Sequence, residues 1–325
     1  CSSEITARYK ARLLQGDSLT DLTGGFGIDC SFLATGFKSA TYVERQEELC
    51  EIAAHNFPVL NLNHINIKNE DGVTYLQAMS PVDCLFLDPA RRNEHGGKTV
   101  AISDCEPNVA ELEELLLQKA NRVMIKLSPM LDLSLALKEL KQTQEVHILS
   151  VNNECKELLI LLGQTSPAEI SIHCVNLFTK GTQKEQHFVF TREQEQCSEC
   201  TYTDSLETYL YEPNASLLKA GAFRSIAAAY PVRKLHPNSH LYTSDTFIEN
   251  FPGRIFRIVN QCSFNKKEVK ENLADLKKAN VTVRNFPATV AELRKRIHLA
   301  EGGDTYLFAS TLNNGQKVLI RCEKV

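Results

Sequence analysis

Residues 21–29 have the sequence Asp-Leu-Thr-Gly-Gly-Phe-Gly-Ile-Asp, which follows an apolar strand-like run and opens a helical pattern. Gly25 and Gly27 allow a tight turn whose backbone can approach a ligand, because a Cβ at either position would occupy the ligand's volume. Glu44 ends the next predicted strand, 17 residues after Gly27, and its carboxylate can accept hydrogen bonds from a ribose diol. The glycine turn and this acid therefore predict a site for a nucleoside-bearing cofactor.

Around this turn, short apolar runs alternate with helical patterns, which predicts βαβ units and a parallel sheet covered on both faces. We expect strands at residues 18–22, 40–44, 63–67, 82–88, 122–128 and 145–151, and helices at 28–35, 46–56, 72–79, 105–120, 131–142 and 153–163. The runs 170–178 and 186–191 flank a polar turn and predict an antiparallel hairpin. The predicted fold class is α/β, a Rossmann-like doubly wound sheet with a terminal antiparallel hairpin.

The alternation of strand-like and helical runs ends after residue 192, so we expect three parts. They are a cofactor-binding domain at 1–192, an intermediate region at 193–252 and a smaller C-terminal α+β domain at 253–325. We expect one helix in the intermediate region, at 215–229. In the last part the patterns predict strands at 254–262, 281–286, 304–311 and 316–322 and helices at 266–279 and 290–299. The final two strands meet at Asn-Asn-Gly, residues 313–315, which is a strong hairpin signal.

Composition indicates a soluble protein: 43% of the 325 residues are hydrophobic and 23% are charged, and no run approaches the ~20 apolar residues of a membrane helix. Several of the eleven cysteines lie inside apolar runs, as reduced thiols do, so we expect a cytoplasmic protein. Cys197 and Cys200 form a CxxC pair without a second pair, and no metal site is expected. Because the sequence begins at Cys1, we expect a trimmed form of a longer chain.

The net charge of −4 conceals an asymmetry, since residues 253–325 hold 14 Lys and Arg against 7 Asp and Glu. Such an excess favours a polyanionic partner. The candidate phosphate-binding residues are Lys266, Lys267, Lys270, Arg294, Lys295 and Arg296. The alternative is a solvated helix face with i,i+4 partners such as Lys267 and Glu271.

Asp21 distinguishes between two classes of nucleoside cofactor. Its carboxylate, placed before the glycines, suits the cationic amino group of S-adenosylmethionine and would repel the pyrophosphate of a dinucleotide. Cys30 occupies the place of the third glycine of a dinucleotide fingerprint. S-adenosyl-L-methionine is therefore the predicted cofactor.

In this order of motifs the chain resembles class I S-adenosylmethionine-dependent methyltransferases. The resemblance implies cofactor contacts from the first motif, which contains Asp21, Thr23, Gly25, Phe26 and Gly27. It also implies that Glu44 binds the ribose and that Asp71 contacts the adenine amino group, although an acid at this position can equally cap the next helix.

The segment Asp88-Pro89-Ala90-Arg91 matches the catalytic motif of the same enzymes, with Asp88, Pro89 and Arg91 as candidate catalytic residues. In relatives that methylate exocyclic amines, this motif has a second proline and an aromatic residue that stacks on the base. Ala90 and Arg91 depart from it, so Phe26, a C-terminal aromatic residue or Arg91 itself must stack. A covalent uracil-C5 mechanism is not expected, because residues 126–129, Lys-Leu-Ser-Pro, contain no cysteine nucleophile.

The glycine turn, including Thr23, is similar to that of ribosomal guanine-N2 methyltransferases, and residues 205–325 resemble bacterial methyltransferases with a THUMP-like domain. The resemblance implies methylation of a base nitrogen, guanine N2 in type, in rRNA or tRNA. Two alternatives stay open: a small-molecule or protein methyltransferase, and a catalytically silent RNA-binding protein.

Overall fold

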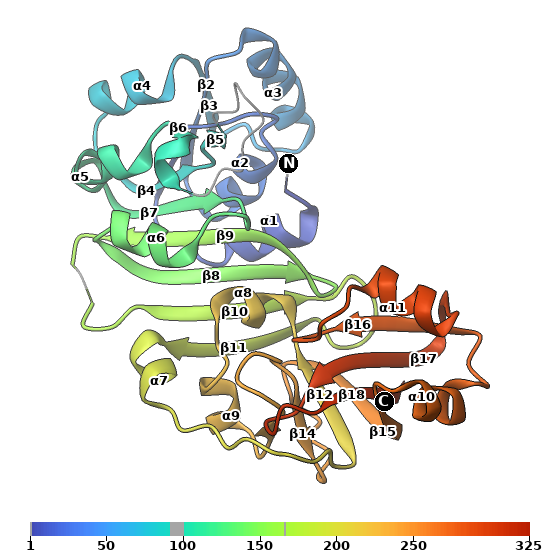
Figure 1. Cartoon of the computed structure of the whole chain (residues 1–325). Helices are drawn as coiled ribbons and strands as arrows, with labels where there is room; N and C mark the ends of the chain where they lie inside the picture. Colours follow the sequence, from blue (N-terminus) through green and yellow to red (C-terminus); the bar gives the residue numbers. More distant parts are fainter. Residues whose placement is uncertain (1, 92–100, 166) are drawn as a thin grey trace. The chain divides into compact units, whose positions relative to one another are not determined.

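The computed structural model describes residues 2–91, 101–165 and 167–325. The chain divides into two compact units, Cys1–Arg192 and Glu193–Val325 (Figure 1). Each unit has its own sheet. No helix in the described ranges has the length and apolar character needed to cross a membrane.

The first unit is built on a sheet that has nine strands among the described residues and confirms the expected α/β fold class. Its strand order is β11 (Glu185–Thr191), β10 (Ser171–Leu177), β8 (Thr143–Val151), β9 (Glu154–Gly163), β7 (Ala120–Leu127), β4 (Val82–Leu87), β1 (Ser18–Asp21), β2 (Ser39–Glu44) and β3 (Ile65–Asn69). β9 and β11 run antiparallel to their neighbours, and the other pairs are parallel. The strand order reverses beside β1, which is where open α/β sheets bind ligands.

Helices cover both faces of this sheet. On one side lie α1 (Glu4–Ala11), α2 (Ile28–Leu33) and α3 (Glu47–Val59) (Figure 1). On the other side lie α4 (Gly72–Ala78), α5 (Val109–Lys119) and α6 (Leu133–Glu139). Short elements complete the unit: two 3₁₀ turns, Ala34–Gly36 and Ile102–Asp104, and the small β5–β6 ribbon, Ala90–Arg91 with Cys105–Glu106.

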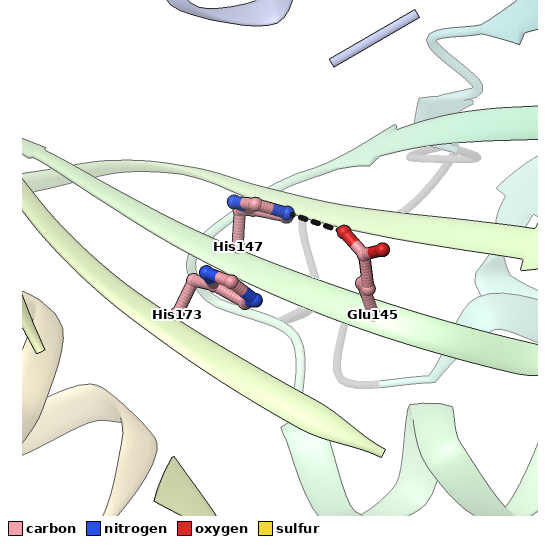
Figure 2. A group of neighbouring side chains, drawn as sticks. All are labelled: Glu145, His147 and His173. Carbon is pink, nitrogen blue, oxygen red and sulfur yellow. Dashed lines mark hydrogen bonds and ion pairs between the residues drawn. The ribbon is translucent and has the colours of Figure 1, made fainter. Parts of the chain in front are cut away.

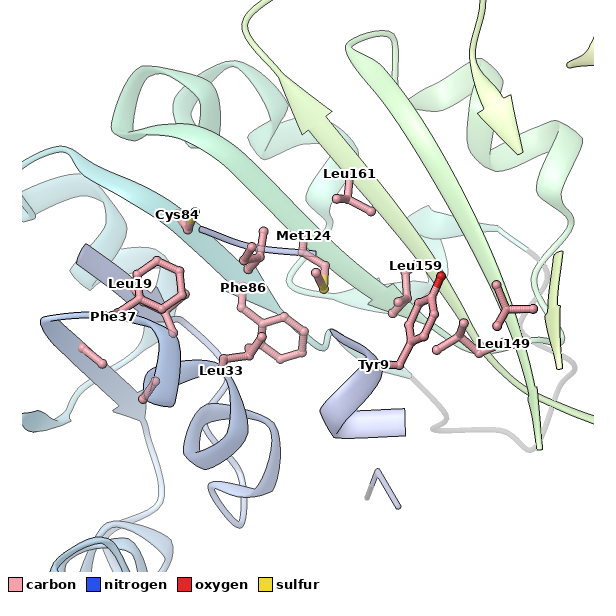
Figure 3. Packing of buried hydrophobic residues seen from close by; sticks show 14 of the residues in the cluster. Tyr9, Leu19, Leu33, Phe37, Cys84, Phe86, Met124, Leu149, Leu159 and Leu161 are labelled. Atoms are coloured by element: carbon pink, nitrogen blue, oxygen red, sulfur yellow. The ribbon is translucent and has the colours of Figure 1, made fainter. Parts of the chain in front are cut away.

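A buried apolar cluster fixes α1 and α2 to the sheet (Figure 3). Tyr9 and Leu33 project from the helices onto Phe86, Met124 and Leu149 of the central strands, and each of these five side chains is at most 5% exposed. Burying a side chain of this size contributes about 1.5–3 kcal/mol. The cluster therefore holds α2, and the glycine turn that begins it, against the edge of the sheet.

The predicted helix at 153–163 is wrong, because these residues form strand β9 between β7 and β8. Residues 158–162 are fully buried, so the run shows no alternation that would mark a strand. Asn152 and Asn153 have φ values of 50° and 67°, the left-handed conformation that closes a tight hairpin between β8 and β9. The terminal hairpin of β10 and β11 is confirmed.

Other boundaries also differ from the sequence expectation. The helix expected at 105–120 begins at Val109, since Cys105 and Glu106 form β6. The helix expected at 215–229 consists of α8 (Ala215–Ala220), which ends at Gly221 with φ 78°, and α9 (Ser225–Ala229).

The second unit contains a mixed sheet of seven strands in its described residues. Their order is β13 (Arg233–Lys234), β14 (Tyr242–Ser244), β12 (Tyr209–Pro213), β15 (Gly253–Ser263), β18 (Lys317–Lys324), β17 (Ala300–Thr311) and β16 (Lys278–Val283). Its helices include α10 (Lys266–Leu273) and α11 (Val290–Ile297), and the short helix α7 (Arg192–Cys197) lies at the boundary of the units. Because β12 pairs with β15, residues expected as an intermediate region share one sheet with the C-terminal α+β domain.

Candidate functional site

The carboxyl edge of the first sheet borders a cavity of about 510 Å³, called the first cavity below. Five residues predicted from the sequence line it: Thr23, Gly25, Glu44, Asp71 and Asp88. They come from the ends of β1, β2, β3 and β4 or from the turns that follow these strands. Parallel strands thus bring together side chains that are up to 65 residues apart in sequence.

Glu44 is held in place by the backbone around it. Its Oε2 accepts a hydrogen bond from the Gly25 amide at 2.9 Å, and its Oε1 accepts one from the Gln46 amide at 2.9 Å. The residue is 9% exposed. Each carboxylate oxygen has a second lone pair, so the Glu44 carboxylate can still accept hydrogen bonds from two ligand hydroxyl groups.

Gly25 and Gly27 both lie in the turn, but different surroundings restrict a side chain at the two positions. Gly25 has φ 55°, and a Cβ there would meet only the Thr23 carbonyl oxygen, at 3.8 Å, which leaves open volume beside the turn. Gly27 has φ 73°, but its Cβ would press on the Phe57 ring at 3.0 Å, so packing within the protein also restricts this position. Phe26 is 55% exposed and lines neither the first cavity nor the one beside it described below.

Asp21 lies at the end of β1 and is 1% exposed. Its Oδ1 accepts a hydrogen bond from the Thr23 amide at 3.0 Å, whereas its Oδ2 has no hydrogen-bond partner within the described ranges. Burial raises the pKa of Asp21 to about 8. A buried carboxylate oxygen without a partner suits a cationic group, although Asp21 does not itself line the first cavity.

Asp71 combines the two alternatives that the sequence leaves open. Its Oδ1 caps α4 by accepting from the Val73 and Thr74 amides, both at 3.0 Å. The same residue lines the first cavity. A capping role therefore does not exclude a ligand contact.

Asp88 also lines a second cavity of about 540 Å³. Among the described residues it alone borders both cavities. Pro89, Lys126, Ser128 and Glu157 also line the second cavity. The backbone of Arg91 belongs to β5, but its side chain lies outside the described residues. The motif residue Asp88 is thus the meeting point of two ligand-sized spaces.

A buried charge network behind Asp88 is absent from the sequence expectations. The Lys126 ammonium lies 2.6 Å from the Asp88 carboxylate and 2.7 Å from the Asp29 carboxylate. Lys10, which is fully buried, contacts Asp29 at 3.0 Å and Glu157 at 2.5 Å. One feature of the sequence could have indicated this network: Lys126 is a cation inside the apolar run of β7, and a buried lysine needs an acidic partner.

The network also determines how these groups ionise. Burial lowers the pKa of Lys126, but the Asp88 and Asp29 carboxylates outweigh this effect and raise it above its ordinary value. Burial raises the pKa of Asp88, and Lys126 opposes the rise. Burial also raises the pKa of Asp29, but Lys10 and Lys126 hold it below its ordinary value. Lys126 therefore stays charged and anchors the Asp88 carboxylate.

Sequence reasoning also missed a strip that lines the first cavity. The β5–β6 ribbon places residues 105–106 beside residues 90–91, and as a result Glu106, Asn108 and Glu111 reach the cavity. Arg45 lines it as well and forms an ion pair with Glu106 at 3.0 Å. These residues belong to no recognisable motif. The sequence also predicted a helix over 105–120, which gave no reason to expect residues near its start at the cavity.

The six predicted phosphate-binding residues divide into three groups. Lys266, Lys270 and Arg296 line a third cavity, of about 590 Å³, on the second unit. Lys267 and Lys295 are exposed outside that lining. Arg294 forms an ion pair with Glu301 at 3.0 Å, so its charge is used within the fold. The Arg296 guanidinium lies 4.1 Å from the centre of the Phe264 ring.

Comparisons with known proteins give the family of this chain. Residues 253–324 match the model of a THUMP domain-like family, and residues 209–252 match that of a ferredoxin-like domain. A solved structure from Porphyromonas gingivalis W83, described as a methyltransferase, is 37% identical over 100% of this chain and 81% of its own, with a TM-score of 0.90. No curated protein matches the sequence.

More distant structures resemble about half of this chain. An rRNA methylase from Streptococcus thermophilus is 14% identical, with a TM-score of 0.35 over 49% of this chain and 93% of its own. A Streptococcus mutans protein in complex with SAH is 13% identical, with a TM-score of 0.35 over 49% of this chain and 96% of its own.

A Rossmann-like unit followed by a THUMP-like domain defines a methyltransferase-like protein of the class expected from the motifs. Within that class, the chain belongs to the same family as the Porphyromonas gingivalis methyltransferase.

Proposed function

We propose that this protein transfers a methyl group from S-adenosylmethionine to a base nitrogen in RNA, with the exocyclic N2 of guanine as the favoured atom. The observation that carries the proposal is that Asp88 borders both the first and the second cavity. Methyl transfer is an in-line displacement, so cofactor and acceptor must meet at one point from two sides. Asp88 is at such a point.

The first cavity suits S-adenosylmethionine on two grounds: Glu44 has free lone pairs for a ribose diol, and Gly25 leaves open volume beside the turn. Asp21, which lies outside the lining, adds a buried oxygen without a partner that suits a cationic amino group. Asp71 is the acid available to the adenine amino group. The bound cofactor supplies an electrophilic methyl group on a sulfonium.

The chain's own residues would position the acceptor. The Asp88 carboxylate accepts a hydrogen bond from an exocyclic amine and so directs the nitrogen lone pair. Lys126 fixes the carboxylate through its 2.6 Å ion pair. The second cavity is lined by a further carboxylate, Glu157, and by the cations Lys126 and Lys156, which suit a polar, phosphate-linked base.

The THUMP-like domain and its cationic third cavity support RNA as the substrate. The test is methyl transfer from tritiated S-adenosylmethionine to total RNA from cells with and without the gene, followed by mass spectrometry of the nucleosides. We expect label in RNA from the cells that lack the gene, in N2-methylguanosine, and little in RNA that is already modified. Label in protein or small molecules would replace RNA as the substrate, and absence of turnover with every acceptor would favour a silent RNA-binding protein.

A further inference from the structure

Strands β8 and β10 bring two histidines and a glutamate together on one face of the first sheet. Glu145 and His147 are two residues apart on β8, so their side chains point to the same face. In the parallel register His173 of β10 lies beside His147, and Ser171 lies beside Glu145. Sequence spacing alone does not reveal this group, because β10 is more than 20 residues further along the chain.

The possible ligand atoms of the three side chains converge. The His147 Nε2 lies 3.3 Å from the Glu145 Oε2, and one atom from each of the three side chains falls within 4.8 Å of the others. Figure 2 shows the two imidazole rings side by side, each with one edge toward Glu145. The ring planes are 18° apart, with 4.3 Å between their centres.

A second set of residues holds the outward-facing atom of each group. The His147 Nδ1 is 2.8 Å from the Tyr9 hydroxyl, and the His173 Nδ1 is 3.1 Å from the His187 Nε2. The Glu145 Oε1 accepts a hydrogen bond from the Arg122 guanidinium at 3.1 Å. Metal-binding histidines characteristically have their other ring nitrogen hydrogen-bonded, which fixes the tautomer. The inner nitrogen of His173, Nε2, lies 3.2 Å from the Ser171 hydroxyl, and a bound ion would replace this contact.

We propose that Glu145, His147 and His173 bind a divalent transition-metal ion of the zinc type. Two imidazole nitrogens and one carboxylate oxygen suit Zn²⁺, whereas Mg²⁺ and Ca²⁺ prefer oxygen ligands alone. Ligand atoms of a tetrahedral zinc site lie roughly 3.3–3.4 Å apart, because each is ~2.0–2.1 Å from the ion. The three atoms lie within 4.8 Å of one another, so side-chain rotation must bring them closer by up to roughly 1.4 Å when the ion binds.

The position of the group indicates a stabilising role rather than a catalytic one. Glu145 is near the start of β8, whereas Val151, at the other end of the same strand, lines the second cavity. An ion here would join β8 to β10 and, through Tyr9, would hold α1. The Glu145 side chain is 32% exposed, which leaves a route for the ion to enter.

The test uses the full chain without a histidine tag, treated with a chelator and dialysed at pH 8. We expect calorimetric titration with Zn²⁺ to give one ion per chain, thermal unfolding to shift upward with Zn²⁺, and Co²⁺ to give visible absorption bands. Glu145→Gln and His173→Ala should each weaken Zn²⁺ binding roughly tenfold or more. His55→Ala, at an exposed histidine of α3, should leave it unchanged.

Glu145→Gln keeps the shape of the side chain, so a folded variant is available even if His173→Ala does not fold. The absence of saturable Zn²⁺ binding to the wild-type chain would overturn the proposal. Binding that is as tight in Glu145→Gln as in the wild-type chain would overturn it as well.

Discussion

Lys126 connects the edge of the two cavities to the interior of the first unit. A buried ammonium is stable only when it is paired, and this one lies within 2.7 Å of two carboxylates, those of Asp29 and Asp88. Asp29 in turn contacts Lys10, which holds Glu157. Positive and negative charges therefore alternate from α1 to Asp88, and the orientation of Asp88 depends in part on Lys10 and Asp29, which line neither cavity.

The first prediction concerns Asp88, which we place at the methyl acceptor. Asp88→Ala should lower kcat roughly a hundredfold while cofactor affinity changes by no more than about threefold, because the contact is made mainly in the transition state. Lys126 keeps Asp29 as a partner, so the variant should fold. Kinetics with RNA, with the exposed Glu48→Ala variant as the control, checks this. Unchanged kcat would move the reaction centre elsewhere.

The second prediction concerns Asp21, whose pKa burial raises to about 8. At neutral pH the free protein keeps this carboxyl largely protonated, and a cationic ligand group requires it ionised. Affinity for S-adenosylhomocysteine should therefore rise from pH 6 to pH 8 and level off above, with a proton released on binding. Calorimetry in buffers of different ionisation enthalpy measures this release. The Asp21→Asn variant should bind S-adenosylhomocysteine more weakly and should not release the proton that comes from Asp21. Release of the same number of protons by both proteins would contradict the assignment of Asp21 to the cationic group of the ligand.

The Asp21 carboxyl should also make the stability of the free protein depend on pH, but here stability falls as the pH rises. Because the folded-state pKa is above the unfolded value, the free energy of unfolding falls as pH rises from about 4 to about 8. Asp21→Asn removes this dependence, so urea unfolding should show the variant gaining stability relative to the wild-type chain over that interval. A parallel pH dependence in the two proteins would contradict a raised pKa.

Among the elements, β12 and the residue after it contain the sequence Tyr-Glu-Pro-Asn at 211–214, in which two side chains have a structural role. Glu212 is 2% exposed and forms ion pairs with Arg254 and Arg284, the latter at 3.1 Å. Asn214 caps α8 by accepting a hydrogen bond from the Leu217 amide. These contacts join β12, β15 and the segment after β16, and they explain Glu212 and Asn214 of the sequence at 211–214 without a ligand.

The third prediction follows from this arrangement. Glu212→Ala leaves two guanidinium groups without their common partner and should lower the free energy of unfolding by roughly 2–3 kcal/mol, since both arginines are partly exposed and can rehydrate. Glu323→Ala removes the exposed pair with Arg257 and should cost less than about 1 kcal/mol. Urea unfolding followed by circular dichroism measures both, and equal losses would refute the structural role.

The elements also show what the sequence can and cannot predict. The glycine turn, the acid of β2 and the alternation of strands and helices are local signals, and they located the first cavity. Strand β9 was missed because a strand buried on both faces resembles a buried helix in sequence. The Lys126 network and the Glu145 group depend on register between strands, which local patterns do not encode.

At the scale of the whole molecule, basic residues outnumber acidic residues in the C-terminal part, residues 253–325. The fourth prediction concerns the role of this basic excess in RNA binding. Lys266, Lys270, Lys277 and Arg296 line the third cavity. Arg296 also packs on the Phe264 ring, and Arg294 pairs with Glu301, so neither arginine is suitable for reversal. Changing the three lysines to glutamate should weaken RNA binding and flatten its salt dependence, because each phosphate contact contributes about 0.7–0.9 to the slope.

The control for this variant is an equal charge change on the first unit, at the exposed residues Lys68, Lys138 and Lys180. This control should retain most RNA affinity, and cofactor affinity should be unchanged in both variants. Equal losses of RNA affinity would show an effect of net charge alone, and the third cavity would lose its role in RNA binding.

The most direct test of the account is calorimetric titration of the full chain with S-adenosylhomocysteine and, separately, with NAD. We predict saturable binding of S-adenosylhomocysteine with one site per chain and no binding of NAD. Glu44→Ala should weaken the binding by about 1.5–3 kcal/mol, the value of a charge-assisted hydrogen bond. Binding of NAD without binding of S-adenosylhomocysteine would contradict the account.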